Sequence, residues 1–327
     1  MIQLLRNLTN RQLILPFYHA VADNIPVHLK HLYNVRSIKQ FNDDIDFLLK
    51  HYTPVSLDDV YNWLKSKNKL PKNAFLLTFD DGLREFYTNI FPVLKSKNIP
   101  SVLFVNTAFV DNKELFFRFK ASLIIDFIKN NRNHKLVLEA TKVFEGIMTT
   151  IPDLKTFVAK VQYLHRKVLD NLADFFGINF TDYLQKQQPY LTLNELKELQ
   201  NNSVYIGSHS VDHPLFYLLN DDEKIYQITE SVNFINDNFS QKISAFSFPF
   251  TDFGLSSSFF NKIFSENLID ISFGTAGIKK DSAKFNLQRI PIEDYNSDTD
   301  INSILLHQYL YFMLKAPFFK NKIRRVK

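Results

Sequence analysis

Short apolar, β-branched or aromatic runs recur along the chain, with helical patterns between most of them. Seven runs have the character of buried strands: Leu13–Tyr18, Ala74–Phe79, Ser101–Val105, Val204–Gly207, Ala245–Phe248, Asp270–Phe273 and Gln288–Ile292. Strands that alternate with helices pair in parallel, so the pattern predicts an α/β fold. Seven strands favour a barrel-like arrangement over an open, doubly wound sheet.

Helix start signals lie between the predicted strands. "SIKQF" at Ser37 and "TLNEL" at Thr192 are capping boxes, and "SLDDV" at Ser56 is a weaker version of the same signal. Residues 114–188 contain no good strand but carry long amphipathic stretches. We therefore predict a helical insertion at 114–188 within a single domain that spans residues 1–327.

The composition is that of a soluble globular protein with a full-sized core. The 327 residues are 45% hydrophobic and 22% charged, and none is cysteine. A disulfide framework and a thiolate metal site are thereby excluded, so a metal ion would need His, Asp or Glu as ligands. Arg6 and Arg11 interrupt the N-terminal apolar stretch, which does not resemble a signal peptide. We expect a cytoplasmic protein.

The positive charge of the chain is concentrated at its C-terminal end. Residues 315–327 form a predicted basic tail with no acidic residue and with six basic ones: Lys315, Lys320, Lys322, Arg324, Arg325 and Lys327. Without these six charges the formal net charge of +5 becomes −1. The body of the protein therefore lacks the basic face of a nucleic-acid-binding protein, and we expect no nucleic acid partner.

Aromatic residues precede this basic tail in "YLYFMLKAPFFKNKIRRVK". A segment that combines aromatic and basic residues is typical of peripheral contact with an anionic membrane surface, here the inner face of the membrane. The alternative is that the aromatic residues cover the barrel and that the basic end is a solvated tail. Pro317 divides the segment, which argues against one continuous interfacial helix.

Two adjacent carboxylates end one of the predicted strands. In "AFLLTFDDGLREF", Asp80 and Asp81 follow the apolar run and precede Gly82. Reactive side chains of an α/β barrel lie at the C-terminal ends of its strands, and a turn that begins at Asp81 would bring both carboxylates to one pocket. Two carboxylates that close together need a cation or a proton between them. The alternative is that one of them only caps the following helix.

A second polar cluster follows another predicted strand. In "YIGSHSVDHPLF", His209 and His213 lie four residues apart, and Pro214 disfavours helical geometry at His213. We therefore expect a loop that brings the two imidazoles together. Two histidines and one carboxylate, with positions left open for water and substrate, form a common catalytic zinc set. A histidine pair alone is more often structural, but the strand-end Asp-Asp-Gly favours a metal site.

These two stretches resemble the first two motifs of the NodB-type polysaccharide deacetylases, carbohydrate esterase family 4. The matching residues are "TFDDG" and "HSVDHP", in this order at strand ends. The resemblance implies a distorted (β/α) barrel of about seven strands. It also implies that Asp80 is the general base and that Asp81, His209 and His213 bind one divalent metal ion, which we expect to be zinc.

The family's third motif is matched only in part. It usually has an arginine two residues before a proline, followed by an aromatic residue. In "FSFPF", Pro249 and Phe250 match, but Ser247 stands where the arginine would be. That arginine normally orients the base, so the sequence leaves open how Asp80 is positioned. The resemblance implies that Pro249 and Phe250 lie at the substrate and that the backbone N–H of Phe250 serves the oxyanion.

The resemblance also implies a histidine that acts as the general acid. His19 ends the first predicted strand in "LILPFYHAV", as in circularly permuted, PgaB-like relatives in which the strand carrying this histidine comes first. The other candidate, His307, lies in a predicted helix that is apolar all along, where a surface or packing role suits it better. We therefore expect His19 to be the acid; the alternative for His19 is an ordinary histidine at a barrel rim.

The reaction that the resemblance implies is removal of an N-acetyl group from an amino sugar in a polysaccharide or glycan precursor. A catalytically impaired, carbohydrate-binding relative is the alternative, since the motif arginine is missing. Retention of Asp80 favours an enzyme, because a binding module needs no second carboxylate beside a metal ligand. A metal-dependent phosphoesterase would usually need a second metal and more charged residues near the site, which the sequence does not offer.

Overall fold

The computed structural model describes residues 2–131, 135–144, 146 and 153–326. The chain forms two compact units. The barrel unit comprises Met1–Asp23, Asn34–Asp111 and Tyr190–Lys327, and the helical unit comprises Asn24–Tyr33 and Asn112–Pro189. Residues 132–134, 145 and 147–152 of the predicted insertion, and Lys327 of the predicted tail, lie outside the described residues.

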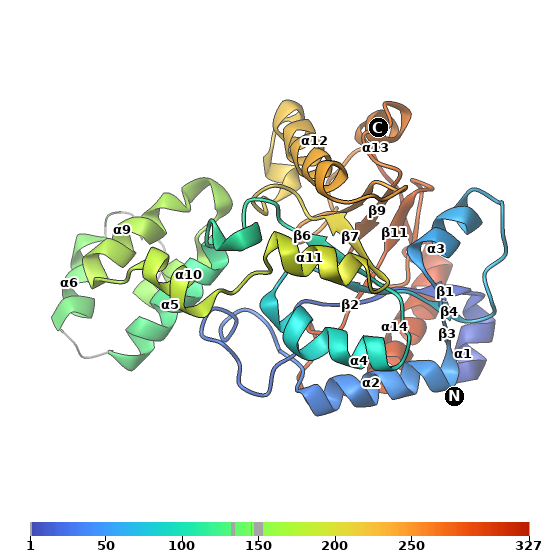
Figure 1. Ribbon diagram of the computed structural model, residues 1–327, viewed down its shortest axis with the longest axis horizontal. Coiled ribbons are helices and arrows are strands. Elements are labelled where there is room, and N and C mark those ends of the chain that lie inside the picture. The colour runs from blue at the N-terminus through green and yellow to red at the C-terminus, as the bar shows by residue number, and fades with distance from the viewer. Residues whose placement is uncertain (1, 132–134, 145, 147–152, 327) are drawn as a thin grey trace. The chain divides into compact units, whose positions relative to one another are not determined.

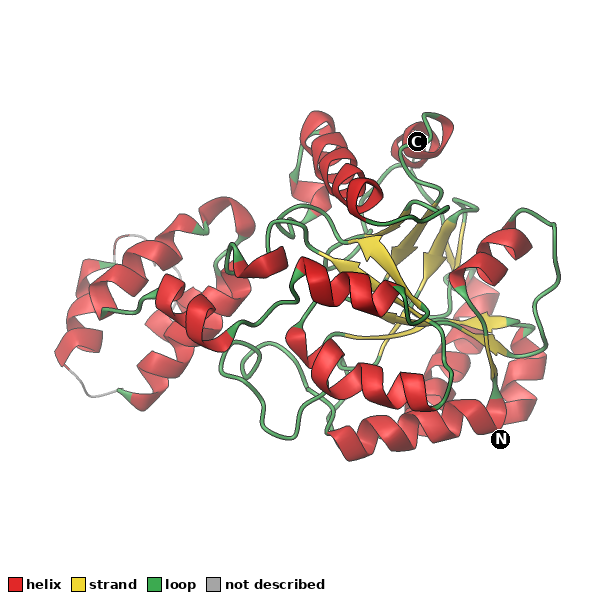
Figure 2. Ribbon diagram, viewed as in Figure 1, coloured by secondary structure: helices red, strands yellow, loops and turns green. Residues whose placement is uncertain are grey.

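An eight-stranded sheet forms the centre of the barrel unit, and every strand pair in it is parallel. Figure 2 shows these strands with the helices of the unit around them. In the order in which they pair, the strands are β11 (Asn286–Gln288), β9 (Ile271–Gly274), β8 (Ala245–Ser247), β7 (Val204–Ser208), β6 (Ser101–Val105), β5 (Leu77–Phe79), β2 (Pro16–Tyr18) and β12 (Ile290–Pro291).

The two edge strands of this sheet are halves of one extended segment, separated only by Arg289. β11 pairs with β9 on one side, and β12 pairs with β2 on the other, with Ile290 opposite Pro16. The two edges of the sheet therefore meet through a single segment, and the sheet curls into a distorted barrel of seven chain segments. The predicted barrel of about seven parallel strands is confirmed, and each predicted run carries one of these segments.

The remaining strands form two small sheets. They are β1 (Leu13–Ile14), β4 (Ala74–Phe75) and β3 (Thr53–Pro54) in one sheet, and β10 (Lys280–Asp281) with β13 (Lys322–Ile323) in the other. The helices of the barrel unit, labelled where space allows in Figure 1, are α1 (Ile2–Thr9), α2 (Ile38–His51), α3 (Leu57–Leu64), η1 (Phe86–Ile90), α4 (Phe91–Ser96), α11 (Leu193–Gln200), η4 (Phe216–Leu218), α12 (Asp221–Asn238), α13 (Ser257–Ser265), α14 (Ile301–Lys315) and η5 (Ala316–Phe318).

Barrel strands are buried on both faces, which explains why their sequences are continuously apolar rather than alternating. Phe79 and Leu103 belong to one buried cluster together with Phe41 of α2 and Leu196 of α11. Phe104 belongs to another cluster and packs against Phe273, with ring centroids 5.2 Å apart. The strand ends, where polar residues follow these runs, are therefore fixed by a core on each side of the sheet.

All three predicted helix start signals are confirmed. At α2, Ser37 Oγ accepts a hydrogen bond from the backbone N–H of Gln40, and the Gln40 side chain accepts one from Ser37 N at 2.9 Å. Thr192 caps α11 in the same reciprocal way. Ser56 also forms a complete box, with the shorter carboxylate of Asp59 as partner. Each box satisfies backbone donors that the first turn leaves unpaired.

The helical unit contains the described residues of the predicted insertion, 114–188. Its helices are α5 (Phe117–Asn130), α6 (Lys135–Val143), α8 (Leu154–Lys160), η3 (Tyr163–His165), α9 (Lys167–Phe176) and α10 (Phe180–Gln187), preceded by η2 (Val110–Asn112) at the boundary between the two units. Phe127 of α5 stacks on Phe176 of α9 with ring centroids 4.8 Å apart. The sequence did not indicate that residues 24–33 join this unit, where Ser122 Oγ donates to the carbonyl of Val27 at 2.6 Å. Across the described ranges, the longest and most apolar helices fall short of what a bilayer span requires.

Candidate active site

The predicted turn after β5 brings both aspartates into one site. Asp81 and Gly82 have left-handed backbone conformations, with φ of 70° and 64°, and the chain leaves the strand abruptly. Glycine suits the second position, since a Cβ there would lie 2.9 Å from Val105 Cγ1. Both carboxylates are buried and face the same imidazole nitrogen: His209 Nε2 lies 3.8 Å from Asp80 Oδ2 and 3.7 Å from Asp81 Oδ1.

The two histidines come from a loop after β7, as predicted, and not from a helix. His209 follows the strand directly, and its backbone N–H donates to the carbonyl of Val105. His213 has a left-handed φ of 63°, and its N–H donates to Ser210 Oγ at 3.1 Å. The ring centroids of His209 and His213 lie 4.8 Å apart. The loop thus folds back on itself and places both imidazoles beside Asp81.

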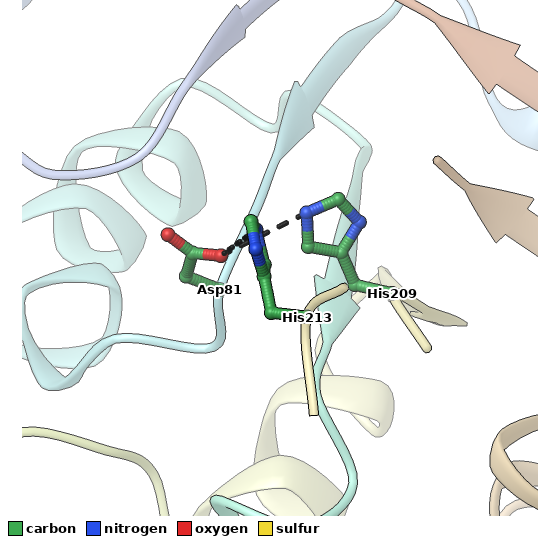
Figure 3. Close-up of side chains that lie close together, drawn as sticks. All are labelled: Asp81, His209 and His213. Atoms are coloured by element: carbon green, nitrogen blue, oxygen red, sulfur yellow. Dashed lines mark ion pairs between the residues drawn. The ribbon is translucent and has the colours of Figure 1, made fainter. Parts of the chain in front are cut away.

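Asp81, His209 and His213 converge on one point (Figure 3). Each offers one ligand atom, these atoms lie within 4.8 Å of one another, and all three residues are buried. His213 Nε2 lies 3.2 Å from Asp81 Oδ1. Two imidazole nitrogens and one carboxylate oxygen at this spacing fit a divalent cation of the zinc type.

The protonation state of His209 also fits a metal ligand. Its Nδ1 lies 2.8 Å from the carbonyl oxygen of Ser247, so Nδ1 carries the proton and the lone pair of Nε2 faces Asp81. Burial lowers the pKa of His209 to about 4, although the neighbouring Asp80 opposes this effect. The imidazole is therefore neutral at physiological pH, which is the form that binds a metal ion.

Arg289 holds Asp80 in place. Its guanidinium donates two parallel hydrogen bonds of 2.7 Å, Nη1 to Asp80 Oδ1 and Nη2 to Asp80 Oδ2. Burial favours the neutral carboxyl group, but the charge and hydrogen bonds of Arg289, together with the charges of His209 and His19, outweigh burial and keep the pKa of Asp80 below its usual value. Nη2 also donates to Ser247 Oγ at 2.6 Å. The small side chain of Ser247 thus lies next to Arg289, which comes from the segment between β11 and β12.

Arg289 therefore explains how Asp80 is positioned although the third motif lacks its arginine. Sequence reasoning missed Arg289, which lies 42 positions from Ser247 and between β11 and β12. A signal was present in "LQRIPI": a charged residue in a predicted buried strand, two residues before Pro291. A buried arginine requires a partner, and Asp80 was the carboxylate that lacked its orienting arginine.

His19 follows β2 and is paired with Glu293, which follows β12. Glu293 accepts hydrogen bonds from His19 Nδ1, from the backbone N–H of His19 and from that of Ala20. Burial disfavours the charged imidazole, but the charge and hydrogen bond of Glu293 outweigh burial and raise the pKa of His19 to about 9. Asp80 and Asp81 act in the same direction. His19 is thus a protonated group in the electrostatic field of the two aspartates; sequence reasoning missed Glu293, although "IPIED" places it at a strand end.

Phe250 lies against the histidine loop. Its backbone is left-handed, with φ of 58°, directly after Pro249, and its ring centroid is 4.5 Å from that of His213. The third motif therefore borders the candidate metal site. His307, in contrast, lies on α14, where its Nδ1 is 2.9 Å from the hydroxyl of Tyr295 and its ring stacks on Tyr311. These contacts agree with a packing role.

A family model described as "Polysaccharide deacetylase" matches residues 67–136 and 155–259, which together make up more than half of the chain. The chain therefore belongs to the polysaccharide deacetylase family, and the resemblance to NodB-type deacetylases is confirmed. The matched ranges include the aspartate pair, the histidine loop and the Pro249–Phe250 turn, whereas His19, Arg289 and Glu293 lie outside them.

Among individual proteins, the chain is similar to two poly-β-1,6-N-acetyl-D-glucosamine N-deacetylases. It is 41% identical to the Escherichia coli (strain K12) protein over 51 residues, which is 16% of this chain and 8% of that protein. It is 32% identical to the Staphylococcus aureus (strain N315) protein over 74 residues, which is 23% of this chain and 26% of that protein. The chain thus matches only a small part of the length of these relatives.

Solved structures share the fold over nearly the whole chain. The deacetylase PplD of Streptococcus pyogenes, in complex with acetate, has a TM-score of 0.57 at 15% identity and covers 90% of this chain and 96% of its own. A de-N-acetylase from Aggregatibacter actinomycetemcomitans has a TM-score of 0.56 at 17% identity, covering 89% and 98%. IcaB from Ammonifex degensii has a TM-score of 0.53 at 14% identity, covering 91% and 97%.

Proposed function

We propose that this protein is a metal-dependent hydrolase that removes an N-acetyl group from an amino sugar in a polysaccharide or glycan precursor. The observation that carries the proposal is the convergence of Asp81, His209 and His213 next to a second carboxylate, Asp80, which Arg289 holds in bidentate fashion. A binding protein has no use for a buried, ionised second carboxylate at such a site. Membership of the polysaccharide deacetylase family supports the same reaction class.

Asp81, His209 and His213 would hold one divalent ion, and their two nitrogen donors and one carboxylate favour zinc. Such an ion supplies Lewis acidity toward the acetamide carbonyl and lowers the pKa of a water molecule. Asp80 then takes the proton of the attacking water. The low pKa of Asp80 keeps this base ionised, and Arg289 fixes its orientation toward the site.

The amine must leave with a proton, because an unassisted amide nitrogen is a poor leaving group. His19 donates this proton as the C–N bond breaks, and Glu293 keeps the imidazole protonated and oriented. The backbone N–H of Phe250 stabilises the negative charge that develops on the carbonyl oxygen, in a turn that Pro249 helps to fix. Water adds across the amide bond, so the products are acetate and a free amino sugar.

Exposed aromatic rings beside the site support a sugar substrate. Phe250 is 37% exposed next to His213, and Phe253 is 78% exposed three residues further on. Tyr217, also exposed, lies against the same loop, since a Cβ on Gly254 would be 3.3 Å from Tyr217 Cβ. Aromatic faces supply a large apolar contact area, which suits the C–H faces of sugar rings.

Simultaneous measurement of acetate and free amine tests the proposed activity. The purified, zinc-loaded protein would be incubated with a panel of N-acetylated glucosamine oligomers and with matched O-acetylated glycans as controls. We expect equimolar acetate and primary amine from N-acetylated members of the panel. Saturable glycan binding without acetate release would instead identify the catalytically impaired, carbohydrate-binding alternative.

Glu293→Gln is expected to move the alkaline limb of the pH–rate profile to lower pH. The acid form of His19 is required, so the rate falls as the pH rises through the pKa of His19. Removing the charge of Glu293 lowers that pKa, because the largest of the effects that raise it is lost. The measurement is kcat between pH 6 and about pH 10. Glu266→Gln, at an exposed glutamate after α13, is the control; an alkaline limb that stays in place in Glu293→Gln would argue against His19 as the acid.

We further propose that the protein works at the inner face of the membrane, on a glycan or lipid-linked precursor. The outward side of α14, η5 and the cap residue after η5 supports this location, because it exposes Leu310, Leu314, Phe318 and Phe319. Lys320, Lys322 and Arg324 are exposed on the segment that follows. Apolar side chains flanked by cations bind anionic interfaces, and each basic residue contributes about 1 kcal/mol near the surface.

Co-sedimentation with vesicles tests this location. The wild type is expected to bind anionic vesicles in a salt-sensitive manner and not to bind neutral vesicles. The double variant Phe318→Ser/Phe319→Ser is expected to lose binding to anionic vesicles. Leu138→Ser, at an exposed leucine of α6, serves as the control. Equal recovery of wild type and double variant in the supernatant would exclude the membrane proposal and leave the proposed activity untouched.

A further inference from the structure

The C-terminal segment is anchored to the barrel and is not a free tail. β13 pairs with β10, with Asp281 opposite Ile323, and Ser282 N donates to the carbonyl of Ile323 at 3.0 Å. Further on, the carbonyl of Val326 accepts a hydrogen bond from Ser257 N at 2.7 Å. The main chain is therefore held on both sides of Arg325, which turns toward the barrel while its neighbour Arg324 stays exposed.

Arg325 forms a buried ion-pair cluster with two aspartates. Its guanidinium donates to Asp281 Oδ1 and Oδ2 at 3.1 and 2.5 Å, to Asp252 Oδ2, and to the backbone carbonyl of Asp252 at 2.6 Å. The three side chains are each no more than 3% exposed. One cation thus neutralises two carboxylates that would otherwise repel each other in a desolvated setting.

The barrel is built to receive this cluster. Asn286 Nδ2 and Gln288 Nε2, both from β11, donate to Asp252 Oδ2 at 2.7 and 2.6 Å and also reach Asp281. Gly274 at the end of β9 leaves the space that the carboxylate occupies, since a Cβ there would lie 2.3 Å from Asp252 Oδ2. The position of Asp252 is therefore fixed from three sides: by β9, by β11 and by the C-terminal segment.

Two parts of the catalytic machinery adjoin this cluster. Asp252 lies two residues after Phe250, whose carbonyl also accepts a hydrogen bond from Thr275 Oγ1 at 3.1 Å. Gln288 immediately precedes Arg289, the arginine that holds Asp80. Arg325 thus binds the backbone of the loop that carries the proposed oxyanion donor, and its aspartate partners are bonded to the segment that carries the arginine of the base.

We propose that Arg325 is a positioning residue of the active site, acting through Asp252 on the loop of Phe250 and through Gln288 on Arg289. This inference rests on the proposed deacetylase function. Removal of the guanidinium leaves two buried carboxylates without their cation, and they must separate or admit water. Because Asp252 is part of the oxyanion loop, that relaxation displaces the Phe250 N–H, and a displacement of about 1 Å costs on the order of 10² in rate.

The test compares Arg325→Ala with Arg324→Ala, a matched removal of the adjacent, exposed arginine. Arg325→Ala is expected to lower kcat by about 10- to 100-fold with the zinc content unchanged and little change in KM. Millimolar guanidinium should restore part of this kcat, because the small cation fills the vacated site. Arg324→Ala should keep wild-type kcat on a soluble N-acetylglucosamine oligomer, an assay that involves no membrane contact. If Arg325→Ala keeps kcat within twofold of wild type, the proposal is wrong.

A second readout does not depend on the activity. Hydrogen exchange of the loop peptide around residues 248–254 should become faster in Arg325→Ala and remain unchanged in Arg324→Ala. If Arg325→Ala does not fold, Arg325→Lys replaces it in the test. This variant keeps the positive charge but loses the planar guanidinium group with its several donors, so it should show an intermediate kcat and faster loop exchange. Unchanged exchange in both Arg325 variants would overturn the inference. If the wild type releases no acetate but the loop still exchanges faster in Arg325→Ala than in the wild type, only the proposed function is refuted.

Discussion

The Asp80→Asn variant is expected to keep its metal ion and to lose about 10²- to 10⁴-fold in kcat, the usual range for a general base. Asparagine occupies nearly the same volume but cannot accept the proton of the attacking water. Asp80 is not one of the three converging ligands, so the ion should remain bound. The measurement is kcat together with zinc content on the same sample.

Asp80→Asn also has a stability cost that must be separated from the loss of catalysis. The guanidinium of Arg289 is fully buried and would lose its charged partner, and breaking a buried pair from one side costs about 3–5 kcal/mol. Assays therefore need a temperature at which thermal unfolding shows the variant to be folded. Asp81→Asn is the matched comparison, because it should lose the ion instead. A folded, zinc-replete Asp80→Asn whose kcat falls less than tenfold would contradict the role of Asp80.

Replacing His209 or His213 with alanine is expected to abolish zinc binding and acetate release together. Each substitution removes one of only two nitrogen donors, and a single remaining imidazole with Asp81 makes a weak site. We expect zinc affinity to fall by more than the 10- to 100-fold that the loss of a ligand's supporting partner typically costs. Zinc content after dialysis and acetate release are measured on the same preparations.

His307→Ala is the control for the two ligand variants. It also removes a histidine from the barrel unit, but His307 contacts Tyr295 and Tyr311 and not the candidate metal site. It should retain one ion per chain and full activity. Full zinc occupancy in the double variant His209→Ala/His213→Ala would show that the ion is held elsewhere. Loss of activity in His307→Ala, with His19→Ala active, would place the general acid on α14.

The parts of the site that the sequence predicted are those in which chemistry and local pattern coincide. Asp80 and Asp81 directly follow one apolar run, and the histidine loop directly follows another. Parallel strands bring their C-terminal ends to the same side of a barrel, so two strand-end motifs meet without any knowledge of distant contacts. Pro214 correctly indicated that His213 lies in a loop and not in a helix.

The site residues that the sequence did not reveal depend on how the barrel closes. Arg289 and Glu293 lie more than 200 positions from the residues they support, Asp80 and His19. They reach these partners because the segment that contains β11 and β12 pairs with β9 on one side and with β2 on the other. A run of apolar residues indicates a strand but not its neighbours, so the sequence could not show that the arginine missing at Ser247 is replaced from across this closure.

The C-terminal segment shows the same limitation for charge. A cluster of basic residues with no nearby acid resembles a solvated tail when only local sequence is considered. The partners of Arg325 are 44 and 73 positions away, in a strand and a loop of the barrel. Basic residues that look alike in the sequence therefore differ in the structure: the Arg325 side chain is buried in an ion pair, whereas Lys320, Lys322 and Arg324 are exposed.

Metal-dependent release of acetate tests the central claim most directly. The protein would be stripped with a chelator, reloaded with zinc in steps and assayed for acetate and free amine from an N-acetylglucosamine oligomer at each step. The proposed site predicts no release from the stripped protein and a linear recovery that saturates at one zinc ion per chain. Undiminished release from protein shown to contain no metal, or no release from protein that holds one ion per chain, would contradict it.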